Sequence, residues 1–130
     1  IEFKDLELNR GQYLYLTRVF EHPGIISDHL AILLNIDRTT TARGIRKLER
    51  AGLIFKEDDE TNKKIKHLFV TNTGKKLAKE IERENVYSNT LVTKGLTKDE
   101  QARLQKYLSV LEKNARENWN FVKNGGKRKY

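Results

Sequence analysis

The sequence contains no cysteine and no methionine. Without cysteine the protein can form no disulfide and has no thiol that could sense oxidants. The missing methionine includes the initiator, so we expect either that this chain begins inside its gene product or that residues have been left out of it. No stretch approaches the roughly 20 apolar residues that span a bilayer, and no signal peptide opens the chain. We therefore expect a soluble, cytoplasmic protein without membrane association.

The motifs of enzymes and cofactor sites are missing as well. The sequence has no nucleophile elbow, no phosphate-binding loop and no Gly-x-Gly-x-x-Gly. Its three histidines, His22, His29 and His67, lie far apart and have no cysteine beside them, so a metal site built from them would also need Asp or Glu ligands. That alternative stays open, but we predict no enzymatic activity, no cofactor and no metal.

Positive charge is the feature present in excess. Lys and Arg number 26 against 18 Asp and Glu, which gives a formal net charge of +8. Such a charge predicts attraction to polyanions, with nucleic acid as the leading candidate, and a homodimer would double it to about +16. A chain of 130 residues suits one domain with one core, or one protomer whose second core forms only on dimerisation.

The stretch from Ser27 to Gly52 has the pattern of two short helices joined by a tight turn. Ser27 is the predicted N-cap of the first helix and Asp37 the predicted N-cap of the second. Gly52 follows the second helix, where a positive φ is needed to end it. These signals together predict a helix-turn-helix.

The second of these helices has one apolar and one basic side. Thr41, Ile45 and Leu48 recur at steps of four and three, the period of a buried helical face. Successive side chains are rotated by 100°, so the opposite side of this helix faces outward. That side, together with the helix start, carries hydroxyls and bases. These candidate DNA contacts are Arg38, Thr39, Thr40, Arg43, Arg46, Lys47 and Arg50. Phosphates and base edges are their expected partners, and a merely solvated basic face is the alternative.

A hairpin is predicted directly after this helix. The apolar residues of the first predicted strand are Leu53, Ile54 and Phe55, and those of its return partner are Ile65, Leu68, Phe69 and Val70. The polar residues 58–63 form the loop between them, as in two strands that flank a turn. Residues 25–26 could add a third short strand. A hairpin in this place is a wing, and its basic residues Lys63, Lys64 and Lys66 are further candidates for DNA contact.

Helices are predicted on either side of this region. The first spans residues 8–20, with Tyr13, Leu16 and Phe20 on its inner side and Tyr15 elsewhere. Another begins after Thr71 and runs to about Val92. Its predicted inner stripe consists of Leu77, Ala78, Ile81, Asn85 and Ser88.

The C-terminal helix is predicted to start at a capping box formed by Thr97 and Glu100. Beyond it an apolar stripe recurs at steps of four and three. Its members are Leu104, Leu108, Leu111, Ala115, Trp119 and Val122. Because this small protomer offers nothing long enough to bury such a stripe, we predict a two-fold dimer seam, with ordinary core packing as the alternative.

In combination these elements resemble the MarR (multiple antibiotic resistance regulator) family of transcription factors. The matching segments are the opening LELNRGQYLYL, the DHLAILLNIDRTTTARGIRKLERAGLI core and the junction VTNTGKKL, which is similar to the family's Leu-Thr-x-x-Gly. The segment GLTKDEQARLQKYLSVLEKN is similar to the helix that closes the family's dimer. The resemblance covers most of the chain.

The resemblance implies a mainly α fold with a small β-hairpin wing, in which a winged helix-turn-helix is joined to a helical dimerisation lobe. The expected parts are a DNA-binding lobe (8–74), a dimerisation lobe that is incomplete at its N-terminus (1–7 and 75–124), and a flexible basic tail (125–130). An effector pocket between the lobes would involve Tyr13, Phe20 and His22.

The wing departs from the family pattern. The family usually has Asp-x-Arg or Asp-Arg-Arg where this sequence has Asn62, Lys63 and Lys64. Lysine supplies charge without the planar fork of arginine. We therefore expect the wing to contribute mostly non-specific affinity.

Two functions follow from these observations. The first is a dimeric, sequence-specific DNA-binding regulator, a repressor on a pseudo-palindromic operator that a small-molecule effector releases. The alternative is a winged-helix interaction module whose basic helix meets an acidic protein. Binding to DNA that discriminates sequences and falls steeply with salt would separate the two.

Overall fold

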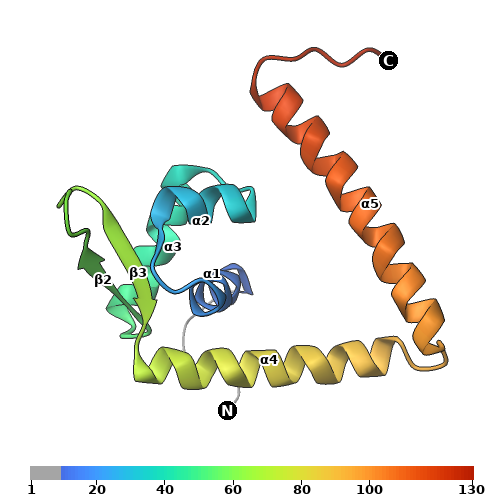
Figure 1. Cartoon of the computed structure of the whole chain (residues 1–130), viewed down its shortest axis with the longest axis horizontal. Coiled ribbons are helices and arrows are strands. Elements are labelled where there is room, and N and C mark those ends of the chain that lie inside the picture. The colour runs from blue at the N-terminus through green and yellow to red at the C-terminus, as the bar shows by residue number, and fades with distance from the viewer. Residues whose placement is uncertain (1–9) are drawn as a thin grey trace. The chain divides into compact units, whose positions relative to one another are not determined.

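The computed structural model describes residues 10–130, which form helices and one small sheet (Figure 1). The elements in order are α1 (Arg10–Glu21), β1 (Ile25–Ile26), α2 (Ser27–Leu34), α3 (Arg38–Arg50), β2 (Ile54–Asp58), β3 (Lys66–Val70), α4 (Asn72–Val92) and α5 (Lys98–Lys123). This order confirms the predicted, mainly α, winged helix-turn-helix. Residues 1–7, assigned to the dimerisation lobe, lie outside the described residues. The chain divides into two compact units, one ending at Tyr87 and the other spanning Ser88–Tyr130.

The sheet is antiparallel, in the order β1-β3-β2. Ile25 pairs with Leu68, so the predicted third strand is present. The ladder between β2 and β3 runs from the pair of Ile54 and Val70 to the pair of Asp58 and Lys66. The wing is thereby confirmed, with a first strand that is longer than the sequence predicted.

One core holds the first unit together. Helices α1, α2 and α3, the sheet and the beginning of α4 all contribute to it. Its fully or almost fully buried members include Leu16, Val19, Leu30, Ile45, Leu48, Leu53, Ile54, Leu68 and Ala78. Because Ile45 and Leu48 belong to this core, α3 cannot rotate without opening it, and its outer side is fixed.

The core side of α1 differs from the prediction. Tyr15 is 5% exposed and Val19 is fully buried, whereas Tyr13 and Phe20 are only half-buried. The ring of Tyr15 lies against α3, where a Cβ on Gly44 would come within 2.4 Å of it. Because Gly44 has no side chain, α3 leaves room for the ring of Tyr15. The spacing of apolar residues in the sequence did not assign this ring to the inner side of α1.

Side-chain caps define several helix ends. Asp37 accepts a hydrogen bond from the backbone amide of Thr40 at 2.8 Å, as predicted. The hydroxyl of Thr71 likewise accepts from the amide of Gly74 at 3.0 Å. Gly52 has a φ of +72° directly after α3, also as predicted.

Ser27 is not the N-cap of α2, so this prediction is wrong. Ile26 occupies the cap position in an extended conformation and provides no side-chain hydrogen bond. The reason is that Ile26 pairs with His67 in the sheet, so the helix starts directly from the strand.

The inner stripe of α4 is shorter than predicted. Leu77, Ala78 and Ile81 are buried, but Asn85 and Ser88 are exposed. Ile81 is the last buried residue of α4, so α4 covers no core beyond its third turn. In residues 10–130 no helix is both long and apolar enough to cross a membrane.

The second unit is built on α5. Its start confirms the predicted capping box: the hydroxyl of Thr97 accepts from the amide of Glu100 at 3.1 Å, and the carboxylate of Glu100 accepts from the amide of Thr97 at 3.0 Å. No residue of α5 is buried.

Candidate nucleic-acid interface

The outer side of α3 is strongly basic, because this helix has five Arg or Lys residues and one acidic residue, Glu49. Thr41, Ile45 and Leu48 are buried, which confirms the predicted inner side. All seven candidates on or near the outer side are exposed: Arg38, Thr39, Thr40, Arg43, Arg46, Lys47 and Arg50. The structure therefore presents them together on one surface.

Most of this charge is not neutralised within the chain. Arg38 lies 3.5 Å from the carboxylate of Asp28. Glu49, the one acidic residue of α3, forms an ion pair of 3.2 Å with Lys56 of β2. Among the ion pairs of residues 10–130, none involves the other bases of α3. These free bases are Arg43, Arg46, Lys47 and Arg50, and they can all meet an anion.

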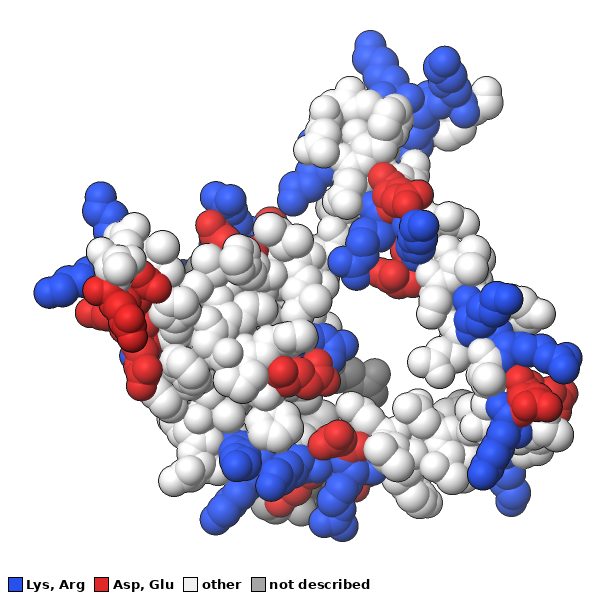
Figure 2. All heavy atoms as spheres, viewed as in Figure 1, with Lys and Arg blue, Asp and Glu red and all other residues white. Residues whose placement is uncertain are grey.

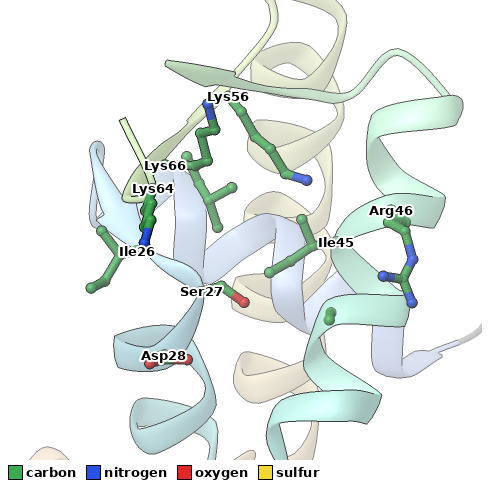
Figure 3. Close-up of a pocket in the computed structure, with 10 residues that line it drawn as sticks. Ile26, Ser27, Asp28, Ile45, Arg46, Lys56, Lys64 and Lys66 are labelled. Carbon is green, nitrogen blue, oxygen red and sulfur yellow. The ribbon is translucent and has the colours of Figure 1, made fainter. Parts of the chain in front are cut away.

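A groove of about 250 Å³ separates α3 from the wing. Figure 3 shows Arg46 on the α3 side and Lys56, Lys64 and Lys66 on the wing side. The start of α2 adds Asp28 and Ser27, and the apolar lining is formed by Ile26, Ala42, Ile45 and Leu68. Of its four bases, Lys56 and Lys66 are paired with Glu49 and Asp58. Within the described part of the chain, Arg46 and Lys64 remain without an ion-pair partner, and they make this groove suitable for a polyanionic backbone.

The wing lysines differ in their surroundings. Lys63 and Lys64 are exposed in the loop, and the backbone amide of Lys64 donates to the side chain of Asn62 at 3.1 Å. Lys66 forms an ion pair with Asp58 in the adjacent strand. Lys66 therefore offers less free charge than the two loop lysines do.

Lys56 is a groove residue that sequence reasoning missed. It follows Ile54 by two positions and so lies on the same face of the strand, which is the face toward α3. The signal for it is in the sequence: Ile54 is an apolar strand residue, and the alternation of strand side chains puts Lys56 on the same face.

The wing also carries acidic side chains. In the face shown in Figure 2, red side chains gather over the wing, where Glu57, Asp58, Asp59 and Glu60 follow one another. Unpaired, these carboxylates would repel a polyanion. The pairing of Asp58 with Lys66 and of Asp59 with His67 reduces that repulsion.

His67 forms two short contacts. Its Nδ1 lies 2.7 Å from the carbonyl oxygen of Gly24 and its Nε2 lies 2.7 Å from the carboxylate of Asp59. The hydrogen bonds to Asp59 and Gly24 raise the pKa of the imidazole above its ordinary value of 6.5. The same bond to His67, followed by bonds from Thr61 and Asn62, lowers the pKa of the Asp59 carboxyl. In residues 10–130 no three His, Asp or Glu side chains converge as a metal site requires.

The residues predicted for an effector pocket are not equally placed. Tyr13 and Phe20 pack against the edge of the core, and burial raises the pKa of the Tyr13 hydroxyl. His22, in contrast, is exposed in the turn after α1.

The residues predicted for a dimer seam lie in the second unit. The exposed fractions are 41% for Leu104, 55% for Leu108, 63% for Leu111 and 48% for Trp119. Ala115 is also exposed and Val122 is half-buried. The stripe is therefore open to solvent within this chain.

Known proteins resemble both the sequence and the fold. The family model described as the MarR family matches residues 8–66. An uncharacterized HTH-type transcriptional regulator of Bacillus subtilis (strain 168), YybA, is 49% identical over 130 residues, which is 100% of this chain and 87% of that protein.

Solved structures give the same result. The crystal structure of the transcriptional regulator SlyA matches with a TM-score of 0.87 and 49% identity, covering 94% of this chain and 86% of that one. A putative MarR family regulator from Listeria monocytogenes, crystallised with 26mer DNA, matches with a TM-score of 0.90 and 46% identity, covering 99% and 86%. This chain therefore belongs to the MarR family and is a MarR-type transcriptional regulator.

Proposed function

We propose that the protein is a dimeric repressor that binds a pseudo-palindromic operator and leaves it when a small-molecule effector binds. The observation that carries this proposal is the exposed side of α3, whose four unpaired bases face the same direction beside a basic groove. The Listeria relative has been crystallised with DNA. We expect the cytoplasm as the place of action.

Arg43 is the proposed base reader. It is rotated by about 200° from Thr41, and so lies almost opposite the buried stripe, near the start of α3. A recognition helix meets base edges with its N-terminal residues. An arginine there can donate two hydrogen bonds to guanine, with Thr39 and Thr40 beside it. Arg50, at the far end of α3, would meet only the DNA backbone.

The remaining bases would position the protein on the DNA. Arg38, Arg46 and Lys47 flank Arg43 on α3, and phosphate contacts from such residues fix register without reading sequence. Lys63 and Lys64 of the wing would add further phosphate contacts, because lysine acts as a point charge.

The second unit would supply the dimer. Its exposed stripe is the feature that a second copy could bury, since two identical stripes can pack around a two-fold axis. The proposed division is a DNA-binding lobe of residues 8–74 and a dimerisation lobe that includes residues 75–124, followed by a basic tail. An effector that contacts Tyr13, Phe20 and His22 would change the distance between the two copies of α3.

A titration with DNA tests the proposal. Fluorescence anisotropy should be measured with selected and scrambled duplexes at two salt concentrations. We expect the selected duplex to bind more tightly at both, and both affinities to fall steeply with salt. If the protein binds neither duplex, or does not distinguish them, while it binds an acidic protein, the proposal is wrong and α3 serves protein recognition.

A further inference from the structure

The two faces of the wing differ in chemistry. Lys56 and Lys66 lie on the face toward α3 and line the groove. The opposite face carries Phe55 and Phe69, whose stacked rings have centroids 5.6 Å apart. His67 lies on this second face, two residues before Phe69 in sequence and opposite Glu57 in the ladder. The proposed DNA-binding function does not use this face.

Both contacts of His67 are with acceptors. The backbone oxygen of Gly24 has no proton to give, and the carboxylate of Asp59 is ionised because its pKa is lowered. Each ring nitrogen must therefore carry a hydrogen for both contacts to be hydrogen bonds, and only the doubly protonated imidazolium has two. The neutral ring would lose one of the two bonds.

Asp59 is also the centre of the wing loop. Its second oxygen accepts from the amide of Thr61 at 3.1 Å, from the hydroxyl of Thr61 at 2.9 Å and from the amide of Asn62 at 3.1 Å. The side chain of Asn62 in turn accepts from the amide of Lys64 at 3.1 Å. A continuous series of hydrogen bonds thus connects Gly24, before β1, with Lys64 at the groove.

We propose that His67, as an imidazolium that bridges Gly24 and Asp59, is a positioning residue that holds the wing loop, and with it Lys64, beside the groove. The role of Lys64 in meeting DNA rests on the proposed function, whereas the bridge itself does not. The bridge depends on the residues at positions 59, 62 and 67 of this sequence. It orders the loop of a wing whose basic loop residues are lysines and which has no arginine.

The bridge should be present at low pH and lost as the pH rises. The negative groups that face the ring are Asp59 from the loop and Glu57 from β2, and both favour the imidazolium. Because the pKa of His67 is raised, the bridge contributes fully below the ordinary value of 6.5 and is lost as the pH rises through the raised pKa. The pKa of Asp59 is lowered, so its contribution is present above the ordinary value of 3.8 and is lost as the pH falls through the lowered pKa.

NMR of the free protein tests the bridge without DNA. The ring nitrogens of His67 and the amides of Thr61, Asn62 and Lys64 should be followed from about pH 5.5 to about pH 8.5. We expect His67 to titrate above 6.5 and the three amides to shift with the same midpoint. A His67 that titrates at its ordinary value, or amides that do not follow it, would overturn the proposal.

Two variants sharpen this measurement. Asp59→Asn should return the pKa of His67 toward its ordinary value and uncouple the loop amides from it. Glu60→Gln removes the same charge from the next residue, which is exposed, and should leave the coupled titration intact. If both variants acted alike, general loop charge rather than the bridge would hold the loop, and the proposal would fail.

DNA titrations connect the bridge to binding. At low pH, His67→Gln should weaken DNA binding roughly three- to tenfold, as expected when the wing no longer neutralises backbone phosphates. In the Lys63→Ala and Lys64→Ala background, the same substitution should have no further effect. If the amides follow His67 but His67→Gln leaves DNA affinity unchanged, the bridge stands and the proposed contact of the wing with DNA is wrong.

Discussion

The two units of this chain use the same kinds of apolar side chains in opposite ways. In the first unit Leu16, Leu30 and Leu48 are fully buried, because helices and strands from distant parts of the chain close over them. In the second unit Leu108 and Leu111 remain 55% and 63% exposed, because α5 has no such cover. The comparison teaches that the first unit closes a core of its own, whereas the apolar side chains of α5 find no cover within residues 10–130 of this chain.

The exposed stripe of α5 leaves apolar surface in contact with water, which is unfavourable. Single apolar residues on a surface are normal, but a contiguous row of leucine and aromatic side chains marks an interaction site. A second copy of α5 could cover it with an identical row. We therefore assign the proposed dimer to the second unit and the proposed DNA reading to the first.

The largest expected effect comes from breaking the stripe of the second unit. Leu108→Asp combined with Leu111→Asp should give a monomer in sedimentation, because two carboxylates cannot be buried in an apolar seam. Without bivalency, operator binding should weaken by about 100-fold to 10,000-fold. Ala102→Asp with Asn120→Asp adds the same charges on α5 at positions about 120° from Leu108 and about 180° from Leu111, and this control should remain dimeric. A dimer of unchanged affinity in the first variant would contradict the assignment.

Truncation in the core should affect the first unit by a different mechanism. Leu16→Ala should lower the free energy of unfolding by about 2–5 kcal/mol, because it leaves a cavity in a closed core. Ile32→Ala, at a position that is 68% exposed, should change it little. Urea titrations at two protein concentrations measure both. A destabilisation by Leu16→Ala that depended on protein concentration would mean that the first unit is not self-sufficient.

Within the first unit, Arg43 and Arg50 should differ. Arg43→Ala should cost about 1–3 kcal/mol and relax preference mainly at one base pair in each half-site. Arg50→Ala should weaken binding to all sequences without changing preference. Titrations against a selected site and its single-base variants measure this difference. Unchanged preference for Arg43→Ala would show that another residue reads the bases.

The smallest expected effect is that of the wing. Lys63→Ala with Lys64→Ala should weaken binding to all duplexes alike and reduce the log-log salt slope by about one for each phosphate that the wing no longer neutralises. Titrations of selected and scrambled DNA over a salt series measure both quantities. If this variant no longer discriminated between the duplexes, the wing would have to read bases or groove shape.

Local features of the fold could be predicted from the sequence. The caps by Asp37 and Thr97 and the period of Thr41, Ile45 and Leu48 involve residues within two helical turns of one another, so a pattern contains all the information. The exposed placement of Arg43 follows from that period. The wing could be predicted as well, because its strands are adjacent along the chain.

Features that depend on distant partners could not be predicted in this way. Tyr15 is buried because α3 leaves room at Gly44, and Ser27 loses its capping role because Ile26 pairs with His67 on a strand far along the chain. The same holds for the site. His67 lies 43 residues from Gly24 in the chain, so its bridge depends on a sheet register that no local pattern specifies.

Selection of bound sites from random DNA tests the central claim most directly. Two copies of α3 on a two-fold dimer should meet successive major grooves, so the recovered sites should form a pseudo-palindrome with half-site centres about 10 base pairs apart. The dimer-breaking variant Leu108→Asp with Leu111→Asp should recover no such spacing. Recovery of one unrepeated half-site by the wild-type protein would contradict the account, because it would mean that a single winged helix reads DNA alone.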